Sequence, residues 1–238
     1  MAIFRVGFSR FKASGATTAV TQEHTVTADT SLLLVHITMP ATVDVTVVPA
    51  WSGSNFTLIK QTTSSGSAGD MHTYSYGLVS PAIETGDITY TVDSTSSVVS
   101  ASTSWSGTVS TSVANAVTYL NEAVNNTAST TSVIGSAGTS GRTLLIWGGF
   151  DGADGDPATV TVGFDKIDGG DVGAISYYMA QKIAGAPAAA TITWAVSDEN
   201  AAQLLELIPE ADLATQADVV AAALAYNAAV ASYKQRLQ

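Results

Sequence analysis

The sequence predicts an all-β protein, an antiparallel β-sandwich of jelly-roll-like type, followed by one amphipathic α-helix at the C-terminal end. Hydrophobic and polar residues alternate from Ala16 to Ile208, a period that places successive side chains on opposite faces of a strand. Gly, Pro, Ser and Asp interrupt this alternation at short intervals, as at Ser64–Gly66 and Gly169–Gly170. Many short strands with this spacing favour a sandwich or jelly roll over alternating β–α units.

Three parts follow from this pattern: an N-terminal arm (residues 1–15), a β-sandwich body (16–209) and a C-terminal helix (210–238). A chain of 238 residues fits one large or two small β-domains, and we expect a single body with a shared core. The strands expected in it are Thr25–Thr27, Ser31–Met39, Thr42–Val48, Phe56–Gln61, Tyr74–Leu78, Asp87–Val92, Val98–Trp105, Arg142–Phe150, Thr159–Phe164, Gly173–Ile183, Ala190–Val196 and Ala202–Ile208.

The C-terminal segment carries the clearest helical pattern. Pro209 suits a first helical turn, Glu210 and Asp212 favour the positive end of the helix dipole, and Lys234 and Arg236 favour the negative end. Apolar residues recur in one stripe at Val219, Ala223, Tyr226, Val230, Tyr233 and Leu237, and in an adjoining stripe at Leu213, Ala217, Val220 and Leu224. The helix either folds back onto its own sandwich or packs against another chain. If the helix packs against another chain, its predicted interface residues are Leu213, Val219, Val220, Leu224, Tyr226, Val230, Tyr233 and Leu237.

Two internal features are less decisive. Ser112–Ala123 has near-helical apolar spacing, and the polar run Asn125–Thr131 suggests a crossing point between two halves of the sandwich. Ile88–Val92 resembles Ile192–Val196, and each follows a proline and precedes another apolar strand. A duplication would produce this echo, although alternating Thr and Val also produce such matches by chance.

Composition excludes several classes of function. The net charge of −11 disfavours nucleic-acid binding, which requires a basic surface. The chain has no cysteine, which excludes disulfides, thiolate metal sites and cysteine nucleophiles. No signal-peptide pattern and no apolar run of membrane-spanning length occurs, so we expect synthesis in the cytoplasm without export and no membrane partner.

Candidate catalytic and ligand-binding residues are few. The loop Asp151–Asp156 holds three carboxylates that could bind calcium, but it lacks the distal Glu of a calcium loop, and Asp-Gly turns are common between strands. His24, His36 and His72 lack metal-ligand spacing, and no nucleophile elbow is present. We therefore expect no catalytic site, no metal and no cofactor. Trp105, Trp147 and Trp194 are expected in the core, whereas Trp51, beside a Ser-Gly turn, is the one whose exposure would indicate a carbohydrate platform.

Several short motifs resemble β-sandwich modules of tailed-bacteriophage virion proteins and some bacterial surface proteins, in which a W-N-G turn, an aromatic-x-L-x-N-P strand end and a closing S-G recur. The matching segments are Trp51–Leu58, Tyr74–Pro81, Gly86–Val92 and Trp105–Gly107, continued by Thr143–Gly149 and Thr191–Pro209. Ser52 and Ser80 stand where the motif has Asn.

The resemblance implies a noncatalytic module displayed on a particle or cell surface. It favours a bacteriophage virion protein of the capsid-decoration or head-fibre type, a homo-oligomer bound to other virion proteins. A tail or receptor-binding protein and a carbohydrate-binding adhesin are the alternatives, and a hydrolase on the same scaffold would require a cleft with converging carboxylates.

Overall fold

The computed structural model of the chain describes residues 2–15, 18–65, 70–152, 159–161, 163–183 and 188–210. These residues form three antiparallel sheets, and the described part contains one short helix, α1. The elements are β1 (Phe4–Ser14), β2 (Ala19–Thr25), β3 (Leu32–Pro40), β4 (Val45–Trp51), β5 (Ser54–Asn55), β6 (Thr57–Thr63), β7 (Met71–Val79), β8 (Thr85–Val92), β9 (Ser97–Ser106), α1 (Val113–Ala116), β10 (Val117–Ala137), β11 (Thr143–Asp151), β12 (Thr159–Val160), β13 (Asp165–Val172), β14 (Ile175–Lys182) and β15 (Ala188–Leu207). The all-β prediction is confirmed.

The first half of the chain, which we call the first repeat (residues 2–109), is a sandwich of two sheets. One sheet has the order β1-β9-β3-β7-β6 and the other the order β2-β8-β4-β5. The first strands of the repeat therefore pair with the last ones, β1 with β9 and β2 with β8. The strands between them pair with each other, β3 with β7 and β4 with β5. This nested pairing of two sheets is jelly-roll-like.

The second half, the second repeat (residues 113–210), has the same order. The sheet β10-β15-β11-β14-β13 corresponds to β1-β9-β3-β7-β6, because the first part of β10 pairs with the last part of β15. The later part of β10 pairs with the early part of β15, which also pairs with β12, as β2 and β4 pair with β8. Single long strands thus replace the pairs β1–β2 and β8–β9. Ile88–Val92 and Ile192–Val196, the echo in the sequence, lie in equivalent strands.

The register of pairing shows the duplication residue by residue. One row of neighbours across the first sheet is matched, strand for strand, by one row across the second. A bulge also precedes the last residue of each row, between Leu58 and Lys60 in β6 and between Lys166 and Asp168 in β13. We call these two sets the contact rows; they are Arg10, Ala101, His36, Ser75 and Lys60 in the first repeat, and Glu122, Gln203, Trp147, Met179 and Asp168 in the second.

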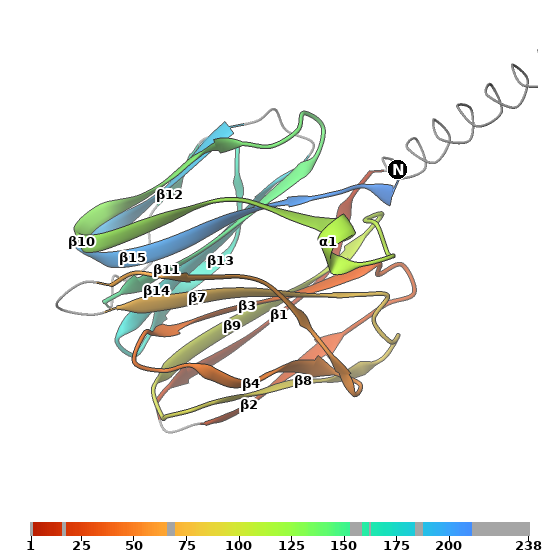
Figure 1. The fold of residues 1–238 in the computed structure, drawn as a ribbon, viewed down its shortest axis with the longest axis horizontal. Helices are drawn as coiled ribbons and strands as arrows, with labels where there is room; N and C mark the ends of the chain where they lie inside the picture. Colours follow the sequence, from red (N-terminus) through yellow and green to blue (C-terminus); the bar gives the residue numbers. More distant parts are fainter. Residues whose placement is uncertain are drawn as a thin grey trace, which may run out of the picture.

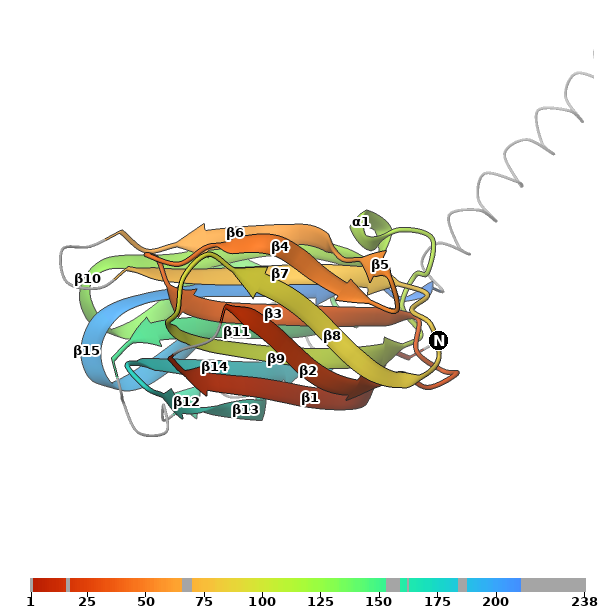
Figure 2. The ribbon, with the colours of Figure 1, turned by 90° about the horizontal axis from the view of Figure 1, so that it is seen from below.

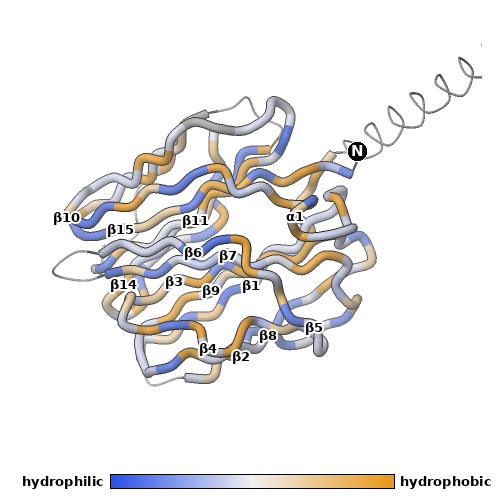
Figure 3. Tube along the Cα trace, in the orientation of Figure 1, coloured by the Kyte–Doolittle hydropathy of each residue, from blue (hydrophilic) through white to orange (hydrophobic). Residues whose placement is uncertain are grey.

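The two repeats stack with these sheets face to face, which makes four layers of strands (Figure 1). One core fills the first repeat around Val35 and Trp51, a second fills the second repeat around Ile146 and Trp194, and a third lies between the repeats. The third core joins residues from both repeats, including Leu34, Met71, Leu145 and Trp147. In Figure 2, β10 and β15 curve together at one end, which lets them contribute to both layers of the second repeat. Hydrophobic and hydrophilic residues alternate along the outer strands (Figure 3).

Contacts between the contact rows follow a pseudo-twofold axis. His36 stacks on its equivalent Trp147, with ring centroids 5.6 Å apart. On one side of this pair Arg10 binds Asp168 at 2.8 Å, and on the other Lys60 binds Glu122 at 3.2 Å. Arg10 and Glu122 are the first members of the two contact rows, and Lys60 and Asp168 are the last members. Each ion pair therefore joins the first member of one row to the last member of the other, and the cation and the anion exchange places between the two pairs. Such a face-to-face arrangement is the isologous geometry of a twofold dimer, here within one chain.

The structure corrects three expectations and decides one open question. The segment expected as an arm forms β1, so the sheets begin at Phe4. The near-helical spacing of Ser112–Ala123 yields only α1, capped by Ser112, because from Val117 the backbone is extended and pairs with β15. Asn125–Thr131 lies within β10, and the chain passes between the repeats at residues 107–112 instead. The body is accordingly not one two-sheet sandwich but two that share a core.

Ser52 and Ser80 have positive φ angles of 48° and 49°. In the described part of the chain they are the non-glycine residues with this conformation, which Asn tolerates better than Ser. Ser52 and Gly53 form the two-residue turn between β4 and β5, the position type where Asn-Gly is preferred. Asn would therefore fit the backbone better than Ser at both positions.

We predict that Ser52→Asn and Ser80→Asn each stabilise the protein by about 0.5 kcal/mol, because Asn adopts the left-handed conformation at lower cost. Urea unfolding measures the change, and Ser54→Asn, at an exposed extended residue, is the matched control. Equal effects of all three substitutions would contradict the explanation.

We also predict that the charge pairs between the repeats are interchangeable. Arg10→Glu alone should destabilise the protein by about 1 kcal/mol through repulsion with Asp168, and Asp168→Lys in the same chain should recover most of the loss. The double variant reproduces the Glu–Lys arrangement of the other pair. A double-mutant cycle in urea checks this, and a coupling energy near zero would count against the symmetry argument.

Candidate functional site

Each of the three histidines lies in a sheet and is bonded to a hydroxyl group. His36 is fully buried and shares a 2.8 Å hydrogen bond with Ser75 through Nδ1. His72 bonds Thr63 at 2.7 Å and lies 3.4 Å from Asp44. Burial lowers the pKa of all three, that of His24 to about 4 and that of His36 to about 3. They are therefore neutral at pH 7.

His24 forms the arrangement closest to a nucleophile and base. Its Nδ1 lies 2.8 Å from the Ser9 hydroxyl and its Nε2 lies 2.7 Å from that of Ser104. A catalytic triad has a carboxylate at the position of Ser9, which stabilises the imidazolium formed when the base takes a proton. Ser104 is fully buried between β9 and β2, and burial disfavours a charged His24. This geometry suits a structural hydrogen-bond chain better than acyl transfer.

All four tryptophans are buried, with at most 1% of their surface exposed. Trp105, Trp147 and Trp194 were expected in the core, and the structure confirms this. Trp51 is also buried, and its Nε1 donates to the Ala82 carbonyl at 3.0 Å. None of the four is available as a stacking surface for a sugar ring.

The acidic residues gather at the end of the molecule where β11 ends and β7 begins. Burial and the nearby carboxylates of Asp198 and Asp70 raise the pKa of Asp151 to about 6. A side-chain hydrogen bond in which the protonated carboxyl of Glu199 donates to Asp198 raises the pKa of Glu199. Asp154, in the middle of the candidate calcium loop, and Asp156 lie outside the described residues. Within the ranges that are described, no group of three or more His, Asp or Glu side chains is arranged to hold a metal ion.

Asp168 and Asp171, which follow the candidate calcium loop in the chain, have structural roles. Asp168 accepts hydrogen bonds from Arg10 at 2.8 Å and from Tyr177 at 2.7 Å. Asp171 accepts one from Ser176 at 2.6 Å. The contact of Asp168 with β1 joins the two repeats.

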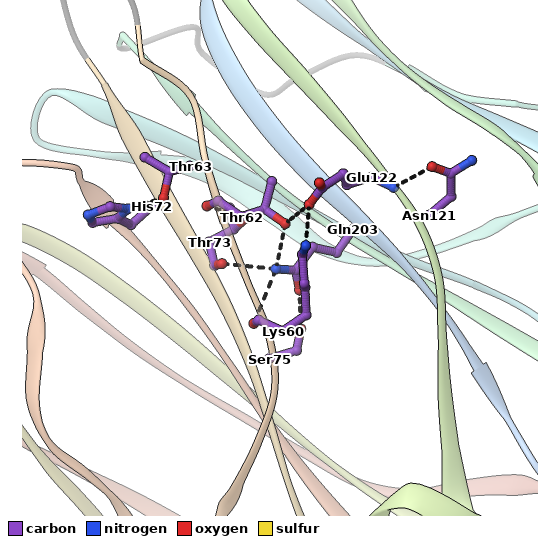
Figure 4. A network of polar contacts seen from close by, with 9 residues as sticks. All are labelled: Lys60, Thr62, Thr63, His72, Thr73, Ser75, Asn121, Glu122 and Gln203. Atoms are coloured by element: carbon purple, nitrogen blue, oxygen red, sulfur yellow. Dashed lines mark hydrogen bonds and ion pairs between the residues drawn. The ribbon is translucent and has the colours of Figure 1, made fainter.

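A buried polar network crosses between the repeats (Figure 4). It adjoins the His36–Trp147 stack, because Ser75 is also hydrogen-bonded to His36. Gln203 donates to the Thr73 carbonyl at 2.9 Å and to the Thr62 hydroxyl at 3.1 Å, and accepts from Ser75 at 2.6 Å. Thr62 in turn donates to Glu122 at 2.5 Å. Nothing in the sequence pattern singles out Gln203, because its importance arises only when the two sheets meet.

At the opposite end from the carboxylates lies an open groove of about 670 Å³. Its walls come from the start of β1, the β2–β3 loop, the β7–β8 loop and the segment after β9, and Glu210 lies on its edge. Phe4 and Ile83 in this groove are exposed by 54% and 67%, and Ile83 is the most exposed large apolar side chain among the described residues. The sequence did not indicate this site, since its residues are far apart along the chain.

The predicted interface residues of the C-terminal segment, Leu213 to Leu237, lie outside the described residues. Glu210 is the last residue described, and its amide donates to the Gly107 carbonyl at 2.9 Å. Among the residues that the structure describes, no helix is long and apolar enough to cross a membrane. The described end of the chain thus places the origin of the C-terminal segment beside the apolar groove.

Comparison with protein-family models, curated proteins and solved structures gave no match.

We predict that acid destabilises the protein through His24 and His36. Because burial lowers their pKa in the folded state, the unfolded chain binds more protons between about pH 4 and 6.5. Their contribution is complete above about pH 6.5 and is lost as the pH falls, by about 1.4 kcal/mol per pH unit for each histidine. Asp151, whose pKa is raised, opposes part of this loss.

Urea unfolding from pH 7 to pH 4.5 measures this slope. His24→Gln keeps a hydrogen-bonding side chain and should reduce the slope by about one proton. A stability that does not change over this range, or an unchanged slope in the variant, would show that these histidines are not buried in the neutral form.

Proposed function

We propose that this chain is a noncatalytic structural protein of a bacteriophage particle, of the capsid-decoration or head-fibre type, attached through its C-terminal segment to other virion proteins. The observation that carries the proposal is the chemical difference between the two ends of the molecule. One end has the groove with the exposed side chains of Phe4 and Ile83, which Asp29 and Glu210 also line, and the origin of the amphipathic segment. The other end has the carboxylates Asp70, Asp151 and Asp198. A protein fixed to a surface at one end and facing solvent at the other has this polarity.

The interior supports a passive role. Its large aromatic residues and its histidines are committed to packing and internal hydrogen bonds in the described residues. The shared core between the repeats buries both faces of β3, β7, β9, β11 and β14. Such a body suits mechanical stability on a particle and leaves the loops and ends for contacts.

The alternatives draw less support. A carbohydrate-binding adhesin with a tryptophan platform loses its main feature, since all four tryptophans are buried. A tail or receptor-binding protein shares the same attached architecture and differs only in the place on the particle. The net charge of −11 continues to disfavour a nucleic-acid partner.

We predict that truncation after Pro209 leaves the body folded, makes it monomeric and abolishes its association with particles. The reason is that the described residues form the three cores without the segment, whereas the second apolar stripe, Val219 to Leu237, is expected to pack on another chain. Thermal unfolding, light scattering and co-sedimentation with particles measure the three effects.

Two full-length variants separate the stripe from chain length. Val219→Asp with Val230→Asp should behave like the truncation, because each charge lies in an apolar stripe. Asp218→Asn, between the stripes and already polar, is the control. A truncated protein that unfolds much earlier while oligomeric state and particle binding persist would place the helix in the body and refute the proposal.

A further inference from the structure

The end groove of the first repeat has the properties of a seat for a short apolar helix. Phe4 and Val6 of β1 form one wall, and Pro81 and Ile83 of the β7–β8 loop form another. Phe4, Val6 and Ile83 expose between 36% and 67% of their surface. A cluster of large apolar side chains left in water at one site marks a contact surface.

The segment outside the described residues starts at this groove. Glu210 lines it, and residues 211–238 continue from that point. Leu213, the first member of the apolar stripe Leu213, Ala217, Val220 and Leu224, follows Glu210 after only two intervening residues. In a helix this stripe extends about 20 Å from Glu210 at 1.5 Å per residue.

The two stripes of the segment point in different directions. At 3.6 residues per turn, the stripe from Leu213 to Leu224 is turned by roughly 120° from the stripe from Val219 to Leu237. The first stripe occupies the half of the segment near the body. The second continues to the end of the chain with the alternating four- and three-residue steps of a helix that packs on other helices. Two apolar stripes that lie on different sides and in different parts of one helix are suited to two different partners.

We propose that the groove seats the first stripe of this chain's own C-terminal segment, beginning with Leu213, so that the second stripe faces other copies or the particle. The proposal rests on the attachment role of the segment and specifies how that segment is oriented. The first stripe would then shield Phe4 and Ile83 from water. Its docking would also fix the direction in which the second stripe, Val219 to Leu237, extends from the body.

The short connection favours the same chain over a second copy. Leu213 is tethered close to Glu210 at the groove edge, so its effective concentration there is far above that of another molecule. Intramolecular docking also avoids the loss of translational and rotational freedom that association requires. A second copy would have to displace this neighbour.

Because the chain has no cysteine, a designed disulfide tests the contact directly. We expect Ile83→Cys with Leu213→Cys to form an intramolecular disulfide in the full-length protein, detected by intact mass and by mobility without reductant. Ile83→Cys with Ala214→Cys is the control, since residue 214 points about 100° away on a helix. The first pair should oxidise about tenfold faster than the control.

Three outcomes would overturn the proposal. In the Ile83→Cys, Leu213→Cys variant, a disulfide that joins two molecules instead of closing within one would assign the groove to a second copy. Equal rates for both pairs would mean that Leu213 is not seated. Chymotrypsin provides a second measurement, because Ile83→Asp should speed cleavage of the C-terminal segment about tenfold by unseating it. An unchanged cleavage rate would also refute the seat.

The experiments distinguish a failure of the groove assignment from a failure of the proposed attachment role. If truncation after Pro209 abolishes particle association but neither the disulfide nor the protease result is obtained, the attachment role stands and the groove assignment falls. If the disulfide forms but truncation has no effect on association, the seat stands and the attachment role falls.

Discussion

The stacking of the two repeats through the contact rows is the interaction on which the rest of the structure depends. The sheets that meet there are also the inner walls of the two sandwich cores, so their central strands are buried on both faces. Leu33 and Val35 pack into the first sandwich, while Leu34 between them packs against the second repeat. Removing either repeat would expose this apolar face to water, which makes the two sandwiches one cooperative unit in physical terms.

The reversed charges at the rim of this interface add selectivity. If two first repeats met through the same face, Arg10 would oppose Lys60, and if two second repeats met, Glu122 would oppose Asp168. The charges at the rim of each repeat are therefore complementary to those of the other repeat and would repel an identical repeat. The pairs are partly exposed, so their contribution to stability is small, but like charges at these positions disfavour the wrong pairing.

Because the face of each repeat that carries the contact row is buried against the other repeat, the ends of the molecule remain for external contacts. The strands of both repeats run between a carboxylate end and an end with the apolar groove, and the chain leaves the second repeat at the groove. The exits of the two repeats are held together, since Val109 donates to the Ile208 carbonyl and Glu210 to that of Gly107. Gly107 has a positive φ, and a Cβ there would lie 2.5 Å from the Ala2 carbonyl oxygen. The root of the C-terminal segment is accordingly a rigid point, which suits an attachment that must hold a body in one orientation.

The sequence by itself determined the all-β class, most of the strands and three of the four buried tryptophans, because these follow from local alternation and from side-chain polarity. It also contained the echo between Ile88–Val92 and Ile192–Val196, although alternating Thr and Val produce such matches by chance. Strands β1 and β13, nearly all of β2 and the strand character of β10 after Val117 were missed, since their identity depends on pairing with β9, β14, β8 and β15. The nested order of the sheets, the stack of His36 on Trp147, the role of Gln203 and the end groove were decided only by the tertiary structure. Each brings together residues remote in the chain, and local periodicity carries no information about which faces meet.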